Sequence, residues 1–352
     1  MSLFTPLSQR SLTLRNRLAI APMCQYSATD GLPDSWHLVH LGSRAVGGAG
    51  LVISEATAVS ADGRISPGDV GLWNEVQQQA WAPITEFIRS QGAIAGVQLA
   101  HAGRKASAQR PWEGGGPLAA EEGAWPTFAP SALPFDAGWH VPAALDEAGI
   151  AGVVDDFRSA ARRALQAGFQ LVELHAAHGY LLHQFLSPLS NRRTDAYGGS
   201  FVNRTRLLRE VLAAVREVWP ENLPVWLRIS ATDWVEGGWD IEQSIELARQ
   251  VGPLGVDLVD VSSGGLVPRV RIPVEPGYQV PFARRIRAEA GIATGAVGLI
   301  DTPELAAAVI DRGDADVVLQ ARESLRDPYF PRRAAKALGA SIDAPLQYQR
   351  AW

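Results

Sequence analysis

The chain contains a single cysteine, Cys24, among its 352 residues. One thiol can neither close an internal disulfide nor supply a four-cysteine metal or iron–sulfur site. We therefore expect a protein of a reducing compartment, without iron–sulfur chemistry.

The sequence also lacks an excess of basic residues and any long apolar run. Its formal net charge is −5, whereas nucleic acids and anionic membranes attract clustered lysine and arginine. No stretch of about eighteen apolar residues could cross a membrane, and the first residues do not resemble a secretory signal. We expect a cytoplasmic protein with neither a nucleic-acid nor a membrane partner.

A repeated pattern dominates the rest of the chain, in which 47% of residues are apolar. A helical segment ends in glycine, which caps it, and a short apolar run rich in β-branched residues follows. Runs without polar alternation are typical of parallel strands that are buried on both faces. The predicted strands are residues 18–22, 51–53, 94–99, 171–175, 224–229, 256–261, 292–297 and 316–319.

The segments between these strands have helical periodicity. Residues 148–167 repeat apolar positions at spacings of three and four, and Asp301 or Thr302 before Pro303 is typical of a helix start. Eight strand–helix units favour one (β/α)8 TIM barrel domain over residues 1–352, although an open doubly wound sheet remains possible. Residues 111–139 are too long for a simple connection, so we predict an excursion after the third strand, as a lid or rim.

Barrel enzymes carry their chemistry at the carboxyl ends of the strands. His175, His178 and Tyr180 follow the fourth predicted strand. Two neutral imidazoles can donate to one oxygen and stabilise an enolate, and a tyrosine can deliver a proton. From the pattern alone, structural histidines remain possible, as does a metal site completed by His101, His183 or Glu173.

The last two predicted strands end in residues suited to phosphate. Gly298 and Ala321 lie where barrels often bind phosphate on backbone N–H groups, and Arg322 adds a planar cation.

Taken together, these residues resemble the Old Yellow Enzyme family of flavin ene-reductases, in particular its thermophilic-like or xenobiotic-reductase-like branch. The similarity runs nearly end to end. The matching segments are LRNR (14–17), APMCQY (21–26), QLAHAGRK (98–105), HAAHGYL (175–181), FLSP (185–188), NRRTDAYGGS (191–200), NR (203–204) and DP (327–328).

The resemblance implies a role for each matched residue. Non-covalent FMN would be lined by Ala21, Pro22, Met23, Cys24, Ala56, Gln98, Arg228, Gly298, Ala321 and Arg322. Arg228 and Gln98 would face the pyrimidine edge of the ring, and Cys24 would tune its redox behaviour beside the reactive face. His175 and His178 would bind the substrate oxygen, Tyr26 would add a second contact, and Tyr180 would be the proton donor.

The implied reaction is ping-pong. NADPH or NADH reduces FMN, and the hydride then passes to the β-carbon of an α,β-unsaturated carbonyl or nitro compound. The tail, residues 340–352, also resembles that branch, in which a terminal arginine enters a neighbouring subunit's site. We therefore expect Arg350 at a subunit interface of a homodimer or homotetramer.

Two features depart from the family pattern. Ala321 stands where glycine is common, so a left-handed backbone is less easy there. Compact members of the family lack residues 111–139. The sequence therefore does not determine the shape of the mouth, by which we mean the opening of the barrel at the carboxyl ends of its strands. Two other functions also remain: a metal-dependent barrel hydrolase using His101, His175 and His178, and a non-catalytic flavin-binding barrel.

Overall fold

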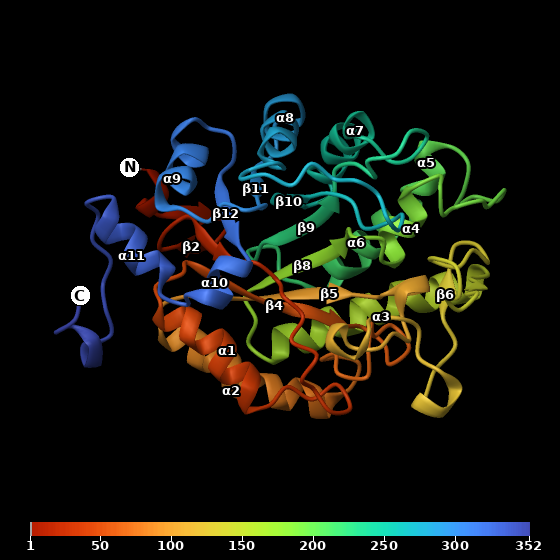
Figure 1. Ribbon diagram of the computed structural model, residues 1–352, viewed down its shortest axis with the longest axis horizontal. Coiled ribbons are helices and arrows are strands. Elements are labelled where there is room, and N and C mark those ends of the chain that lie inside the picture. Colours follow the sequence, from red (N-terminus) through yellow and green to blue (C-terminus); the bar gives the residue numbers. More distant parts are fainter. Residues whose placement is uncertain (1) are drawn as a thin grey trace.

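The computed structural model describes residues 2–352. Eight parallel strands form a closed barrel, because the last of them, β12, pairs with the first, β3. This closure confirms the predicted TIM barrel and rules out the alternative of an open sheet (Figure 1). The barrel strands are β3 Leu18–Ile20, β4 Leu51–Ala58, β5 Ile94–Ala100, β8 Leu171–Ala176, β9 Val225–Ser230, β10 Leu258–Ser262, β11 Thr294–Ala296 and β12 Val317–Gln320.

Four predicted strands, β9, β10, β11 and β12, begin one or two residues later than the sequence pattern indicated. Asp257 and Asp316 precede β10 and β12, and each carboxylate accepts a backbone N–H from a neighbouring strand. Val225 N donates to Asp257 Oδ2 at 2.9 Å, and Thr294 N donates to Asp316 Oδ2 at 3.0 Å. Each aspartate therefore lies just before its strand and is not part of it.

Helices surround the barrel (Figure 1). The predicted helix at 148–167 is α3, Glu147–Gln166, and Thr302 caps α9 through its side chain with Pro303 next in the chain. The longer helices are α1 Ser35–Val46, α2 Glu75–Ser90, α3, α6 Arg206–Val218, α7 Ile241–Val251, α8 Val280–Ala290, α9 Pro303–Asp311 and α11 Phe330–Ala337. The short ones are α4 Leu181–Leu186, α5 Phe201–Arg204 and α10 Arg322–Arg326.

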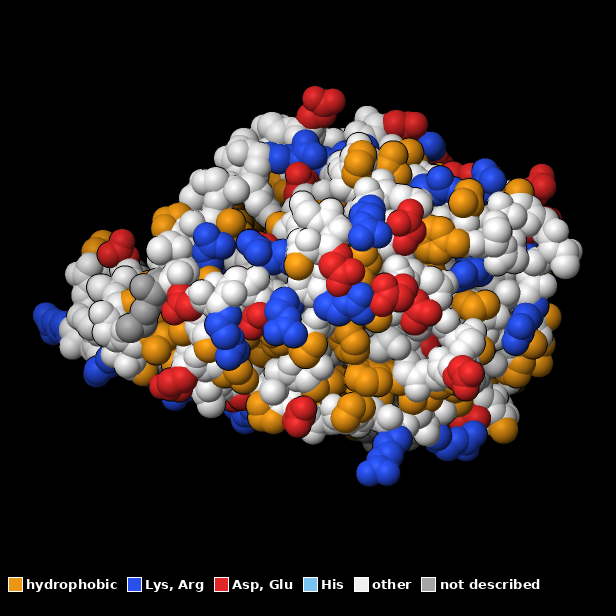
Figure 2. All heavy atoms as spheres, turned by 90° about the horizontal axis from the view of Figure 1, so that it is seen from above, with side chains coloured by type: hydrophobic (Ala, Val, Ile, Leu, Met, Phe, Trp, Pro, Cys, Tyr) orange, Lys and Arg blue, Asp and Glu red, His pale blue; other side chains and the backbone are white. Residues whose placement is uncertain are grey.

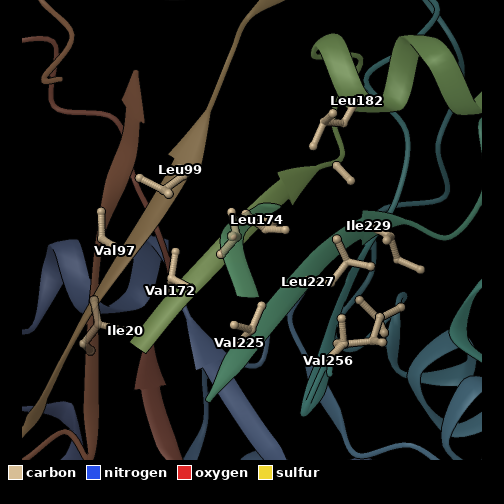
Figure 3. Packing of buried hydrophobic residues seen from close by; sticks show 14 of the residues in the cluster. Ile20, Val97, Leu99, Val172, Leu174, Leu182, Val225, Leu227, Ile229 and Val256 are labelled. Atoms are coloured by element: carbon tan, nitrogen blue, oxygen red, sulfur yellow. The ribbon is translucent and has the colours of Figure 1, made fainter. Parts of the chain in front are cut away.

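Alternate residues of each strand face two separate cores. On β8, Val172 and Leu174 pack in the layer between the strands and the helices (Figure 3). Leu171 instead belongs to the apolar cluster inside the barrel. Because strand side chains alternate, Glu173 and His175 share the interior side with Leu171. The barrel interior is thus apolar at its base and polar toward the carboxyl ends of the strands.

The predicted excursion lies between β5 and α3. The structure extends it beyond the predicted residues 111–139 to the whole connection between these two elements, and the name excursion is used for that connection from here on. The excursion contains the 3-10 turns Gly103–Lys105, Pro111–Glu113 and Ala120–Glu122 and the paired strands β6 Phe128–Ala129 and β7 Ala143–Ala144. The guanidinium of Arg64 lies 4.9 Å from the ring centroid of Trp125 and 5.4 Å from that of Trp73. This cation–π contact attaches the excursion to the segment after β4. In Figure 1 the excursion lies beyond the carboxyl end of β5, as a rim of the barrel.

The amino-terminal end of the barrel carries the hairpin of β1 Leu7–Gln9 and β2 Leu12–Leu14. The carboxyl-terminal tail leaves α11 and forms a 3-10 turn at Leu346–Tyr348. Trp352 stacks on Tyr329 with ring centroids 6.4 Å apart. Figure 1 places the C-terminus at the opposite end of the molecule from α4 and β6.

The surface mixes charges of both signs. On the face drawn in Figure 2, basic and acidic side chains are interspersed with apolar ones. Among residues 2–352, no helix is both long and apolar enough to cross a membrane.

Candidate active site

Three predicted site residues meet directly after β8. The rings of His175 and His178 are perpendicular, with centroids 5.1 Å apart, and Tyr180 lies 4.9 Å from His175. His178 adopts a left-handed backbone with φ of +56°, which turns the chain so that both imidazoles reach the mouth. Tyr180 precedes α4 as its N-terminal flanking residue. The structure therefore brings the predicted oxygen-binding pair and the predicted acid together.

The hydrogen bonds of the two imidazoles leave one nitrogen of each for a ligand. His175 Nδ1 accepts from Ala177 N–H at 3.2 Å, which leaves its proton on Nε2. His178 Nε2 lies 2.7 Å from Ser262 Oγ, so its Nδ1 is the other available nitrogen. Burial and the nearby Arg228 hold the pKa of both histidines well below the usual range. Both rings are therefore neutral donors at pH 7.

Lys105 connects the excursion to this group. Its Nζ donates to the carbonyls of His178 at 2.9 Å and Gly265 at 3.0 Å. It also lies 5.1 Å from the ring centroid of Tyr180. Burial, aided by Arg104, lowers the pKa of Lys105 to about 8. The ammonium thus fixes the strained turn at His178 while facing the tyrosine ring.

Cys24 and Tyr26 follow β3 on the other side of the mouth. Their side chains lie close enough for each to affect the pKa of the other. Burial and the carboxylates of Asp69 and Glu55 raise the pKa of Cys24 well above its ordinary value, so the residue is a thiol at neutral pH. Trp112, from the excursion, packs edge-on against Tyr26 with centroids 5.9 Å apart. The excursion thereby forms part of the mouth.

Gln98 and Arg228 lie deeper, in the polar layer of the barrel interior. Gln98 Nε2 donates to Glu173 Oε1 at 2.8 Å, and Arg228 Nε lies 3.1 Å from Asp260 Oδ2. The terminal nitrogens of Arg228 make no hydrogen bond to any described residue. The Gln98 amide therefore uses one of its two N–H protons in the bond to Glu173.

The predicted phosphate-binding residues line one cavity of about 120 Å³ at the ends of β10, β11 and β12. Gly298 has φ of +124°, and a side chain there would approach Tyr278 and Gln279 at 3.0 Å. Ala321 has φ of −108° and ψ of −99°, so this position does not require a left-handed backbone. Alanine is therefore compatible with the backbone at position 321. Arg322 contributes a cation to the same cavity.

Some predicted residues are not brought to the mouth. Arg350 lies in the exposed tail, at the far end of the molecule (Figure 1). Within residues 2–352, no group of three or more histidine, cysteine or acidic side chains could hold a metal ion. His101 instead accepts from Gly103 N–H, and His183 pairs with Asp233 at 3.0 Å. The hydrolase alternative therefore has no ligand set among these residues.

A larger cavity, of about 530 Å³, lies away from this chemistry. It is lined by residues that precede the barrel strands, such as Asn16 and Gly92, and by 341–345. It is at the amino-terminal end of the barrel, where barrels place stabilising and not catalytic residues.

Sequence reasoning missed Asp260 and the partner role of Ser262. Both lie on β10 with the period-two spacing that places them on the interior side. A carboxylate in an otherwise apolar buried strand was the available signal, as it was for Glu173.

A closed barrel with neutral hydrogen-bond donors, a tyrosine and an arginine-lined cavity around its mouth is the architecture of a cofactor-dependent barrel enzyme. Residues 2–340 match the NADH:flavin oxidoreductase / NADH oxidase family, and the chain belongs to this family. It is an oxidoreductase, as predicted.

Proteins of known name agree with this assignment. The chain is 48% identical to NADPH dehydrogenase of Bacillus velezensis and 49% identical to NADPH dehydrogenase of Listeria innocua, each over 99% of both chains. Among solved structures, morphinone reductase in complex with tetrahydroNAD aligns with a TM-score of 0.79 and 32% identity, covering 98% of this chain and 93% of that one. The old yellow enzyme homologue from Zymomonas mobilis aligns with a TM-score of 0.81 and 29% identity, covering 99% and 96%. The predicted resemblance to the Old Yellow Enzyme family is confirmed.

Proposed function

We propose that the protein is an FMN-dependent ene-reductase that takes hydride from NADPH or NADH and reduces the double bond of activated alkenes. The observation that carries this proposal is the group of His175, His178 and Tyr180. Two neutral N–H donors and one phenol face the same mouth. That combination suits a substrate with a carbonyl or nitro oxygen beside a carbon that must be protonated.

The described residues fit a flavin. The terminal nitrogens of Arg228 have no partner among residues 2–352, and the cavity at Gly298 and Arg322 suits a phosphate. Ala21, Pro22, Met23, Cys24 and Ala56 would line the ring, and Ala321 would support the phosphate with its backbone. When bound, FMN would accept hydride from the nicotinamide and pass it to the alkene.

The protein's own residues bind the substrate, polarise its oxygen and supply a proton to its α-carbon. His175 Nε2–H and His178 Nδ1–H hold the substrate oxygen and stabilise the negative charge that develops on it. Tyr180 donates its phenolic proton to the α-carbon and regains one from solvent. Burial keeps the pKa of Tyr180 well above its usual value, so the proton is present before the step. Tyr26 adds a second contact to the substrate, and Cys24 tunes the flavin as a neutral thiol.

The tail would act in a second copy of the chain. Residues 340–352 lie at the end of the molecule opposite the mouth, so Arg350 could complete only another subunit's site. We therefore infer a homodimer or homotetramer of FMN-binding barrels, acting on small-molecule alkenes in the cytoplasm.

An anaerobic titration tests the proposal. The purified protein should be yellow, should be bleached by NADPH or NADH, and should regain its colour on addition of cyclohexenone. Titrating with each nucleotide in turn establishes the preferred hydride donor. A colourless protein inactivated by a chelator would favour the hydrolase, and a yellow protein that neither nucleotide bleaches would favour a non-catalytic flavin-binding barrel.

A further inference from the structure

Two carboxyl groups, of Glu173 on β8 and Asp260 on β10, are fully buried inside the barrel. Strand β9 separates β8 from β10, so these side chains can meet only through the interior. They lie within hydrogen-bonding distance of each other. On the outer sides of the pair, Gln98 donates to Glu173 at 2.8 Å, and Arg228 lies 3.1 Å from Asp260.

The pair lacks donors if both groups are ionised. Among the described residues, Glu173 Oε2 and Asp260 Oδ1 have no hydrogen-bond donor, and Asp260 Oδ2 has only the ion pair with Arg228 Nε at 3.1 Å. Two adjacent buried carboxylates repel each other and lose their hydration, whereas a protonated carboxyl can donate to its neighbour. Burial and the charge of Asp260 raise the pKa of Glu173, and burial raises the pKa of Asp260. One shared proton therefore leaves the pair with a single negative charge, which Arg228 neutralises.

We propose that Glu173 and Asp260 form a proton-sharing pair that takes up a second proton when negative charge develops above Arg228, and so couples reduction of the cofactor to pH. This inference rests on the proposed flavin function. Glu173 and Asp260 are positioning residues, because they act through Arg228 and Gln98 and do not touch the substrate.

The charge balance defines the coupling. Hydride brings two electrons and one proton into the site, which adds one negative charge. The second proton comes from solvent and ends on the pair, which leaves Arg228 free to face the new charge. Each proton coupled to a two-electron step changes the equilibrium constant tenfold per pH unit, or about 30 mV. One proton thus corresponds to about 30 mV per pH unit, and two protons to about 59 mV.

The groups around the pair limit the useful pH range. Gln98 faces it from β5 and Arg228 from β9, the β11 residue paired with Asp260 is Gly295, and His175 lies above the pair as a neutral ring. Lys105, the other nearby cation, has its pKa lowered to about 8. Measurements between about pH 6 and 7.5 therefore avoid the titration of Lys105.

The experiment is the two-electron midpoint potential of the FMN-loaded protein across this range. The wild type should change by about 59 mV per pH unit, and the double variant Glu173→Gln/Asp260→Asn by about 30 mV, since only removal of both carboxyls leaves no acceptor for the second proton. Thr294→Val is the matched control: it alters a buried polar residue on the adjacent strand and should retain the wild-type slope. A wild-type slope of about 30 mV per pH unit, or a double variant that keeps about 59 mV per pH unit, would overturn the proposal.

Infrared spectroscopy supplies a measurement that does not depend on the variants binding flavin. The reduced-minus-oxidised spectrum of the wild type should gain a protonated-carboxyl C=O band that shifts in D2O, and the absence of such a gain overturns the proposal. If the protein carries no FMN, the proposed function fails. The shared proton is then tested in the flavin-free protein at pH 7, where the wild type should show a carboxyl band that the double variant Glu173→Gln/Asp260→Asn lacks, because Asp69, with a pKa raised to about 7, contributes equally to both spectra. Identical spectra also overturn the pair.

Discussion

The phenol ring of Tyr180 stands at 89° to the imidazole of His175, with centroids 4.9 Å apart. His175 ends the interior face of β8, and Tyr180 immediately precedes α4, so one short strand–helix connection positions both groups. Because this connection is buried and Lys105 bonds its carbonyl at His178, the proton donor and the oxygen-binding pair are held in fixed relation.

Tyr180→Phe should slow alkene reduction roughly a hundredfold or more while leaving flavin reduction by NADPH nearly unchanged, since only the second half-reaction requires a general acid. Stopped-flow measurement of the two half-reactions distinguishes these effects. Tyr197→Phe, which removes a hydroxyl bonded to Glu210 outside the site, is the control. Equal slowing of both halves would rule out Tyr180 as the acid.

His175→Ala should weaken the binding of phenol-type ligands roughly tenfold or more, because hydrogen bonds to a charged oxygen contribute about 1.5–3 kcal/mol. Spectral titration of the flavin measures the dissociation constant. His175→Asn retains an N–H donor and should recover part of the affinity. Ligand binding that is unchanged in the alanine variant would argue against the imidazole pair.

Lys105 should make unfolding depend on pH. Burial lowers its pKa from 10.5 to about 8, so between these values the folded protein holds fewer protons than the unfolded chain. The free energy of unfolding therefore gains a contribution that rises with pH from about 8 to 10.5, by at most about 1.4 kcal/mol per pH unit. Denaturant unfolding of Lys105→Met should lack this contribution. The control is Lys336→Met, which alters an exposed lysine on α11, and identical pH profiles for wild type and Lys105→Met would contradict the prediction.

Cys24 should react slowly with iodoacetamide at pH 7, more than tenfold slower than a free cysteine, because its raised pKa leaves little thiolate. As the only cysteine in the chain, it can be followed by mass spectrometry without ambiguity. Cys24→Ser should retain FMN and shift its midpoint potential. Alkylation at the rate of an ordinary thiol, or loss of flavin in the serine variant, would refute a redox-tuning role for a neutral thiol.

Removal of residues 345–352 should raise the KM for the alkene and alter the assembly, whereas Arg350→Ala should raise KM alone. Steady-state kinetics combined with light scattering measures both. Unchanged kinetics and subunit count in the truncated protein would exclude a shared site.

Much of the barrel could be predicted because its signals are local. Apolar runs marked all eight strands, five of them after a glycine cap, and the cluster at 175–180 identified the mouth. The starts of β10 and β12 were misplaced, since Asp257 and Asp316 lie beside apolar runs but bond to neighbouring strands. The conformation at Ala321 could not be derived from the sequence, because its backbone angles depend on how β12 enters α10.

The sequence by itself determined the alternation of strands and helices and the chemical groups at each strand end, because hydrophobic spacing and capping act over a few residues. Only the tertiary structure decided that Glu173 meets Asp260 across β9, and that the tail lies opposite the mouth. Closure of the barrel forces side chains from strands that are not adjacent into one small interior, and no local pattern encodes which of them will touch.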